Sequence, residues 1–149
     1  MLEAERYFQL NYKQVSEYNF GYDYFFSLFG GKVKNINSLK NYRDFGRVYD
    51  QKESFANKYL VMYLRANDMG CSRIGISVSK KVGNSIVRHR TTRLIRESYR
   101  LNKDKLKSGY DIVVIARNTA KGKNFHEIES AFLHLCRLHH LIERSDSDK

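Results

Sequence analysis

Residues 73–100 read RIGISVSKKVGNSIVRHRTTRLIRESYR, and this stretch joins a strand pattern to a helix pattern. Its first seven residues alternate between branched apolar and small side chains, which is typical of a β-strand with one face on a core. The apolar positions are Ile74, Ile76 and Val78, and the small ones are Gly75, Ser77 and Ser79. Because the small face carries little side-chain bulk, a ligand or a helix can come close to the backbone there.

The second half of the stretch predicts an amphipathic helix over residues 85–101, with Asn84 or Ser85 as its N-cap. Its apolar or small side comprises Val87, Thr91, Leu94, Ile95, Ser98 and Leu101. Its other side carries Arg88, His89, Arg93, Arg96 and Arg100. Positions 89, 93, 96 and 100 share a face, where like charges repel each other unless a polyanion neutralises them. Lys80, Lys81 and the helix N-terminus at Asn84 add anion-attracting groups at one end.

Upstream of this stretch, the spacing of apolar residues predicts a helix over 39–51 with Ser38 as its N-cap. A short apolar run at 59–64 predicts a strand, and the polar residues 67–72 favour an antiparallel hairpin with the strand that begins at Arg73. Phe45 and Tyr49 share one helical face, and Tyr63 lies on the strand. These three aromatic residues fit either an ordinary core or a groove in which unpaired bases stack.

Downstream, YDIVVIA at 110–116 predicts a strand that is buried on both faces. Asn124 and Glu127 have the spacing of a capping box, and apolar residues then predict a helix over 125–142. The alternation of helices and strands indicates an α+β sandwich.

The chain has 149 residues and a formal net charge of +11, and this charge is not evenly spread. Residues 1–37 carry four basic and four acidic side chains, whereas residues 73–107 carry eleven basic ones against Glu97 and Asp104, a local charge of +9. A concentrated basic surface favours a polyanion, either nucleic acid or an anionic membrane surface. The alternative is a basic face that is merely solvated.

No run of about 18 apolar residues and no secretory signal is visible, so we expect a cytoplasmic protein with no membrane partner. Two cysteines, Cys71 and Cys136, are too few for a disulfide framework and are expected to be idle thiols. Residues 1–37 are interpreted as an N-terminal extension of uncertain structure, which could dock, fray or reflect an upstream start codon. Residues 38–142 form the main domain, and residues 143–149 form a polar tail.

No pattern in the chain predicts catalysis by the protein itself. The acidic residues form no recognisable metal motif, and no nucleophile elbow or phosphate-binding glycine loop is present. On the last helix, His134 and His139 or His140 have no carboxylate partner at a familiar metal spacing, and a histidine at the surface or satisfied in the core is the default interpretation. We therefore predict no catalytic residue, no metal ligand and no cofactor bound by the protein alone.

The segment SVSKKVGNSIVRHRTTRLIRE, residues 77–97, resembles the signature region of the protein subunit of bacterial ribonuclease P. The resemblance extends to SLKNYRDFGRVYDQKESFANKYLVMYL at 38–64, to YDIVVIAR at 110–117 and to the last helix. Two positions depart from the family pattern, with His89 in place of an asparagine and Thr92 in place of a lysine.

This resemblance implies an α-β-β-β-α-β-α sandwich with a mixed central sheet and a left-handed βαβ crossover. It also implies that a catalytic RNA, using Mg²⁺, removes the 5′ leader from precursor tRNA while one protein per RNA binds both. The residues expected to bind the catalytic RNA are Asn84, Arg88, His89, Arg90, Arg93, Arg96 and Arg100. Those expected to bind the leader are Phe45, Tyr49, Tyr63, Ser79, Lys80 and Lys81.

Two other classes of function compete with this interpretation. One is a general RNA- or DNA-binding module, such as a ribosomal or chromosomal protein, which the basic helix alone would suit. The other is a nuclease whose active site lies in the protein itself. Reconstitution with a catalytic RNA separates all three.

Overall fold

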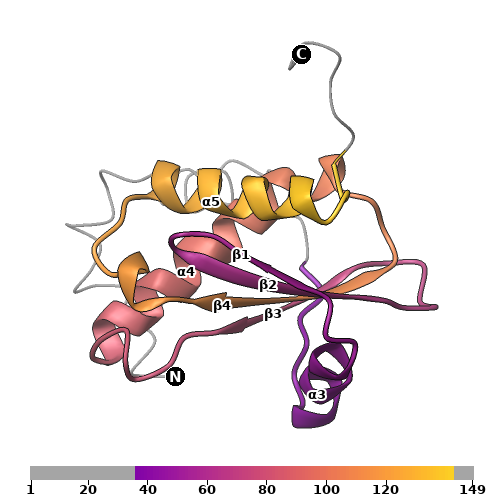
Figure 1. The fold of residues 1–149 in the computed structure, drawn as a ribbon, viewed down its shortest axis with the longest axis horizontal. Helices are drawn as coiled ribbons and strands as arrows, with labels where there is room; N and C mark the ends of the chain where they lie inside the picture. The colour runs from indigo at the N-terminus through magenta and orange to yellow at the C-terminus, as the bar shows by residue number, and fades with distance from the viewer. Residues whose placement is uncertain (1–35, 143–149) are drawn as a thin grey trace, which may run out of the picture. The chain divides into compact units, whose positions relative to one another are not determined.

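The computed structural model describes residues 36–142, whose elements follow the order α-β-β-β-α-β-α (Figure 1). The helices are α3 (Tyr42–Asp50), α4 (Ser85–Asn102) and α5 (Phe125–Leu138). The strands are β1 (Ser54–Ala56), β2 (Leu60–Ala66), β3 (Arg73–Ser77) and β4 (Tyr110–Ala116). Two short 3₁₀ turns, η1 (Lys103–Lys105) and η2 (Asn118–Ala120), follow α4 and β4. The α+β class is confirmed, and β1 is a strand that the residue pattern does not predict.

The predicted N-terminal extension, 1–37, and the predicted tail, 143–149, lie outside the described residues except for Ile36 and Asn37. The division of the chain into these parts therefore stays a prediction. Within residues 36–142, no helix is long and apolar enough to cross a membrane.

The four strands form one mixed sheet in the order β1-β2-β4-β3, in which β4 is antiparallel to β2 and parallel to β3. The predicted hairpin between the strands at 59–64 and 73–79 is wrong, because β4 lies between them. Residues 67–72 cross the start of β4: the Asn67 N–H donates to the carbonyl of Gly109 at 2.8 Å. The parallel strands β3 and β4 are joined through α4, and the left-handed sense of that crossover stays a prediction.

Strand alternation divides the side chains of the sheet between two faces. The face toward α3 contains a row across β2, β4 and β3 that comprises Tyr63, Val113 and Gly75. The next row lies on the opposite face and consists of three buried residues, Leu64, Ile112 and Ile74. Figure 1 shows α4 and α5 covering this second face and α3 alone on the first. The sheet is therefore the middle layer of three.

The first helix begins three residues later than predicted, because the chain before it joins the sheet. The N-cap of α3 is Asn41, whose side-chain oxygen accepts a hydrogen bond from the Asp44 N–H at 2.9 Å, and not Ser38. Leu39 instead pairs with the edge strand β3, where its N–H donates to the carbonyl of Ile74 at 2.9 Å. Leu39 is buried and covers the edge of the sheet. Because its backbone is extended and paired with β3, it cannot belong to the helix.

Both later helices begin where the sequence predicts. Asn84 caps α4 by accepting a hydrogen bond from the Val87 N–H at 3.0 Å. Asn124 and Glu127 form the predicted capping box at the start of α5, with both hydrogen bonds at 2.9 Å. Each cap satisfies donors that a helix N-terminus otherwise leaves unpaired.

The last helix ends at Leu138, earlier than the predicted residue 142. His140 takes a positive φ of 58°, and its N–H donates to the carbonyl of Arg137 at 3.0 Å. The Leu141 N–H donates to the carbonyl of Cys136 at 2.9 Å, which completes a Schellman motif. Leu141 is buried, so the turn returns one more apolar side chain to the core after the helix has stopped.

His139 lies at this turn and is buried against β2. Its Nε2 donates to the carbonyl oxygen of Met62 at 2.9 Å. Its Nδ1 is buried without a hydrogen-bond partner among the described residues and lies 3.9 Å from Oε1 of Glu53. Burial lowers the pKa of His139, so the ring is neutral in the folded protein near pH 7.

We expect the free energy of unfolding to fall as the pH is lowered from about 7.5 toward 5. The unfolded chain protonates His139 near pH ~6.5, whereas the folded chain does so only at lower pH, so the unfolded state binds more protons in this window. His139→Gln keeps a donor for Met62 and should flatten the pH dependence of the free energy of unfolding. Urea unfolding at several pH values measures this, and an unchanged pH dependence in His139→Gln would contradict it.

Candidate nucleic-acid interface

Helix α4 packs one side on the core, and this side agrees with the predicted stripe in most positions. Thr91, Leu94, Ile95 and Ser98 are buried as expected. Leu101 is 45% exposed, so its predicted place in the stripe is wrong. Tyr99 is buried instead and meets Phe132 of α5 edge to face, with ring centroids 6.4 Å apart. The last turn of α4 thus buries Ser98, Tyr99 and Asn102, while Leu101 faces outward.

The basic side of α4 combines exposed and half-buried side chains. His89 and Arg96 are exposed, whereas Arg88, Arg90 and Arg93 are half-buried. Arg90 donates from Nη1 to the carbonyl of Lys123 at 3.2 Å, which joins the helix to the loop before α5. The Nε of Arg88 is buried without a hydrogen-bond partner among the described residues. Asn84, at the N-cap, places the helix N-terminus at the same end as these side chains.

Arg100 belongs to the predicted basic face, but its charge is matched within the helix. Its Nε and Nη2 lie 2.9 and 2.5 Å from the two carboxylate oxygens of Glu97, which is the single acidic residue of α4. The other four arginines of α4 lie in the N-terminal two-thirds of the helix, which therefore carries more cations than its one carboxylate can neutralise. Thr92, at the position where the family pattern has lysine, donates its hydroxyl to the carbonyl of Arg88 at 2.9 Å and adds no charge.

The aromatic residues of α3 and β2 meet on the opposite face of the sheet. We call Phe45, Tyr49 and Tyr63 the aromatic set. The Phe45 and Tyr49 centroids lie 6.5 Å apart, and Tyr49 meets Tyr63 at 5.0 Å with an interplanar angle of 87°. All three rings are partly buried against Leu39, Val48 and Val113. Burial, followed by the proximity of Tyr63, raises the pKa of Tyr49, so its hydroxyl stays protonated. The set thus packs on the core and keeps part of its surface open, and the stacking of unpaired bases on it stays a prediction.

Gly75 sets how closely α3 approaches the sheet. A Cβ atom on Gly75 would lie 2.6 Å from Cζ of Phe45 and 3.1 Å from a methyl of Leu39. Any larger residue would push the Phe45 ring outward, because such distances are below van der Waals contact. The small-residue face of β3 is therefore used as the sequence predicts, with a helix against it.

Ser79, Lys80 and Lys81 lie apart from the aromatic set along the chain, in the exposed loop between β3 and α4. The Val82 N–H donates to the carbonyl of Ser79 at 3.1 Å and closes this loop into a turn. Strand β3 packs against Phe45 of α3 through Gly75, and the loop after β3 leads to Asn84 at the start of α4. Along the chain, the two lysines therefore lie between the aromatic set and the basic side of α4.

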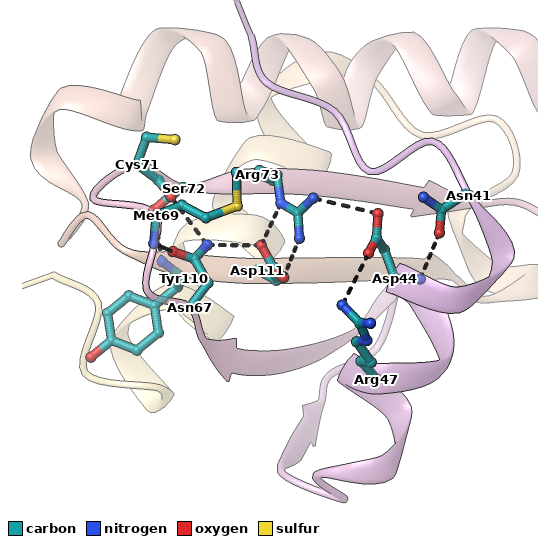
Figure 2. Close-up of polar contacts among 10 residues, drawn as sticks. All are labelled: Asn41, Asp44, Arg47, Asn67, Met69, Cys71, Ser72, Arg73, Tyr110 and Asp111. Atoms are coloured by element: carbon teal, nitrogen blue, oxygen red, sulfur yellow. Dashed lines mark hydrogen bonds and ion pairs between the residues drawn. The ribbon is translucent and has the colours of Figure 1, made fainter.

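A buried ion pair fixes the other end of this face (Figure 2). Asp111 of β4 is 1% exposed and accepts hydrogen bonds from Nε and Nη2 of Arg73 at 2.9 and 2.8 Å and from Nδ2 of Asn67 at 2.8 Å. Burial alone would raise the pKa of Asp111, but the hydrogen bonds from Arg73 and Asn67 outweigh it and hold the pKa below its usual value. The carboxylate is therefore ionised throughout the neutral range.

The same arginine reaches the helix that carries two of the aromatic residues. Nη1 of Arg73 lies 3.4 Å from Oδ2 of Asp44 on α3 (Figure 2). The other carboxylate oxygen of Asp44 forms an ion pair with Nη1 of Arg47 at 3.8 Å. Asp44 is the residue whose N–H is capped by Asn41. The network thus ties the first turn of α3 to β3 and β4. The sequence signal for it is an aspartate inside an otherwise apolar strand, which requires a buried partner.

The described residues contain no group of three or more His, Cys, Asp or Glu side chains arranged to hold a metal ion. Burial raises the pKa of the Cys136 thiol to about 12, so this thiol is not a nucleophile at neutral pH. Cys71 and Cys136 are both free, as the sequence predicts.

Comparison with known proteins gives one consistent result. The family model described as Ribonuclease P matches residues 33–139. The ribonuclease P protein component of Lachnoclostridium phytofermentans is 60% identical over 112 residues, which cover 75% of this chain and 97% of the relative. That of Alkaliphilus oremlandii is 49% identical over 110 residues, which cover 74% and 96%.

Solved structures agree with the curated relatives. The RNase P protein of Staphylococcus aureus matches with a TM-score of 0.67 at 34% identity, covering 73% of this chain and 100% of that one. The RNase P protein of Thermotoga maritima matches with a TM-score of 0.63 at 34% identity, covering 68% and 96%.

Proposed function

Because this chain belongs to the ribonuclease P protein family, we propose that it binds the catalytic RNA of ribonuclease P together with the 5′ leader of precursor tRNA. It is a protein component of an RNA-processing enzyme. In this proposal it assists removal of the leader during tRNA 5′ maturation, with one protein per RNA.

The observation that carries this proposal is the excess of positive charge on the basic side of α4. Helix α4 carries five arginines, at 88, 90, 93, 96 and 100, against the single carboxylate of Glu97, so the acidic residues of this helix cannot neutralise all of its positive charge. RNA phosphates supply that neutralisation, and each contact releases counterions, which favours binding. Arginine also binds phosphate bidentately. Asn84 and His89 lie at the N-terminal end of the same surface and complete the proposed contact with the catalytic RNA.

The aromatic set supports the second half of the proposal, which concerns the leader. Half-buried rings in a row offer stacking surface to unpaired bases, and they do so whatever the base sequence. Ser79, Lys80 and Lys81 add a hydroxyl and two cations for the phosphates of the same strand. The leader would run from the aromatic set toward this loop.

In this proposal the protein performs no chemistry. The RNA subunit uses Mg²⁺ for hydrolysis, and the protein holds the catalyst and its substrate together. The basic side of α4 and the aromatic set support this part of the proposal, because cations and aromatic rings bind RNA without reacting with it.

Reconstitution tests the proposed function. A ribonuclease P catalytic RNA should cleave precursor tRNA faster at low Mg²⁺ when this protein is added, because bound cations replace part of the screening that Mg²⁺ provides. The measurement is the initial rate at several Mg²⁺ concentrations, with the protein alone and the RNA alone as controls.

The outcomes separate the competing functions. If the protein binds RNA but does not accelerate cleavage, it is a general nucleic-acid-binding module. If the protein cleaves precursor tRNA without the catalytic RNA, its active site is its own.

A further inference from the structure

A depression of about 490 Å³ lies beside the first three turns of α5, and none of the aromatic set lines it. It opens between the turn that joins β1 to β2 and one side of α5. Its lining includes Asn57, Lys58 and Tyr59 from the turn and His126, Ser130 and His134 from α5. The α5 residues are four apart, so they share one helical face.

Asn57 fixes the shape of this depression. Its side-chain oxygen accepts hydrogen bonds from the N–H groups of Tyr59 and Leu60 at 3.2 and 3.0 Å. Its Nδ2 donates to the carbonyl of Ala131 on α5 at 2.8 Å, and its own carbonyl accepts from Arg117 at 2.8 Å. The turn is therefore held against both α5 and the end of β4, and the depression is a preformed feature.

Two ammonium groups lie at the ring of Tyr59. Nζ of Lys58 is 5.6 Å from the ring centroid, and Nζ of Lys123 is 5.4 Å from it. Within residues 36–142, neither lysine forms an ion pair with a carboxylate. The ring attracts both cations through its π-face, but it does not neutralise their charge.

Glu127 is the carboxylate that lines this depression, and its side chain is already hydrogen-bonded. Glu127 accepts a hydrogen bond from the Asn124 N–H at 2.9 Å in the capping box, where it faces the positive end of the α5 dipole. The site therefore combines an aromatic ring with two cations that no carboxylate in residues 36–142 neutralises, which suits a base and its phosphates.

The depression also continues the basic surface of α4. Arg90 donates to the carbonyl of Lys123, the same residue whose ammonium group lies at Tyr59. A polyanion on the N-terminal part of α4 thus finds further cations along the loop before α5. This continuity favours RNA over an unrelated anionic ligand.

We infer that Tyr59, Lys58 and Lys123 form a further binding site for one or two nucleotides of single-stranded RNA. The strand must be unpaired there, because a base in a duplex cannot reach the ring. The inference rests on the proposed function for the identity of the polymer, and the strand is a single-stranded part either of the catalytic RNA or of the precursor.

The test compares two double variants that remove the same charge. Lys58→Gln/Lys123→Gln should weaken binding of a single-stranded uridine decamer about tenfold near 0.15 M salt and lower the log–log salt slope by about 1.4. Lys105→Gln/Lys107→Gln removes two exposed lysines beyond the far end of α4 and should leave both unchanged. Tyr59→Ala should also weaken binding about tenfold, whereas Tyr59→Phe should not.

Separate titrations distinguish the two sources of the strand. If the Lys58→Gln/Lys123→Gln variant loses affinity only for a precursor with a long leader, the site binds the leader. If it loses affinity for the catalytic RNA alone, the site binds that RNA. Equal affinity and equal salt slope for the two lysine variants would overturn the site.

Failure of the site and failure of the proposed function are distinguishable. If the Lys58/Lys123 variant binds like the control while the unaltered protein still accelerates cleavage, only the site is overturned. If the unaltered protein does not accelerate cleavage but the variant loses decamer binding, the site stands and the proposed function fails. Circular dichroism of each variant checks that it is folded.

Discussion

Replacing Asp111 by asparagine is expected to lower the free energy of unfolding by about 3 kcal/mol and the melting temperature by about 10–15 °C. The asparagine keeps the volume of the side chain but removes its charge. Arg73 is 20% exposed, so its guanidinium would stay largely out of water without a full counter-charge from β4. Urea unfolding and thermal melts of the two proteins measure the loss.

A double-mutant cycle shows whether this loss belongs to the pair. Arg73→Met together with Asp111→Asn should cost clearly less than the sum of the two single changes, because no buried charge is then left alone. Strictly additive costs would mean that Arg73 and Asp111 stabilise the fold independently, which contradicts the pairing.

The ion pair also predicts a dependence on acid. The pKa of Asp111 is held below its usual value in the folded protein. Its contribution is therefore present above pH ~4 and is lost as the pH falls through the lower pKa of the folded state. The Asp111→Asn variant should show a weaker loss of stability below pH ~4 than the unaltered protein.

The effect should extend to the aromatic set, because Arg73 also contacts Asp44 at the first turn of α3. When Arg73 loses its anchor on β4, Phe45 and Tyr49 are held less firmly over Gly75. We therefore expect Asp111→Asn to weaken binding of a precursor with a leader more than binding of mature tRNA, at a temperature where the variant is folded.

Local patterns predict the elements of this fold well and its pairings poorly. The alternation at 73–79, the apolar run at 110–116 and the cap at Asn84 each depend on neighbours within a few residues. The partner of β3 is β4, which follows α4 in the chain, and no turn signal encodes that choice. The predicted hairpin fails for this reason, and the helix at 39–51 starts late because Leu39 pairs with Ile74 far along the chain.

The candidate site divides in the same way. The basic side of α4 and the shared face of Phe45 and Tyr49 follow from helical spacing alone. The pairing of Arg100 with Glu97 was open to sequence reasoning too, since the two are three residues apart. The contact between the Tyr59 ring and the Lys123 ammonium group could not be predicted from the sequence, because it depends on how α5 packs beside β2.

Replacing Arg93 and Arg96 by alanine is expected to weaken binding of the catalytic RNA about 30-fold at 0.15 M salt. Two phosphate contacts to a duplex contribute about 1.8 to the log–log salt slope, and the slope should fall by that amount. Both side chains project from the basic side of α4, with Arg96 exposed and Arg93 half-buried. Equilibrium binding at four or more salt concentrations measures the affinity and the slope together.

A charge-preserving variant separates electrostatics from geometry. Arg93→Lys with Arg96→Lys should retain the slope, because lysine neutralises a phosphate equally well, but should still lose part of the affinity, because an ammonium group cannot bind two phosphate oxygens in the planar manner of guanidinium. Lys105→Ala with Lys107→Ala, which removes two exposed charges beyond α4, should change neither quantity. If the alanine variant at 93 and 96 kept the slope of the unaltered protein, α4 would face solvent in the complex, and the RNA would have to bind another surface of the fold.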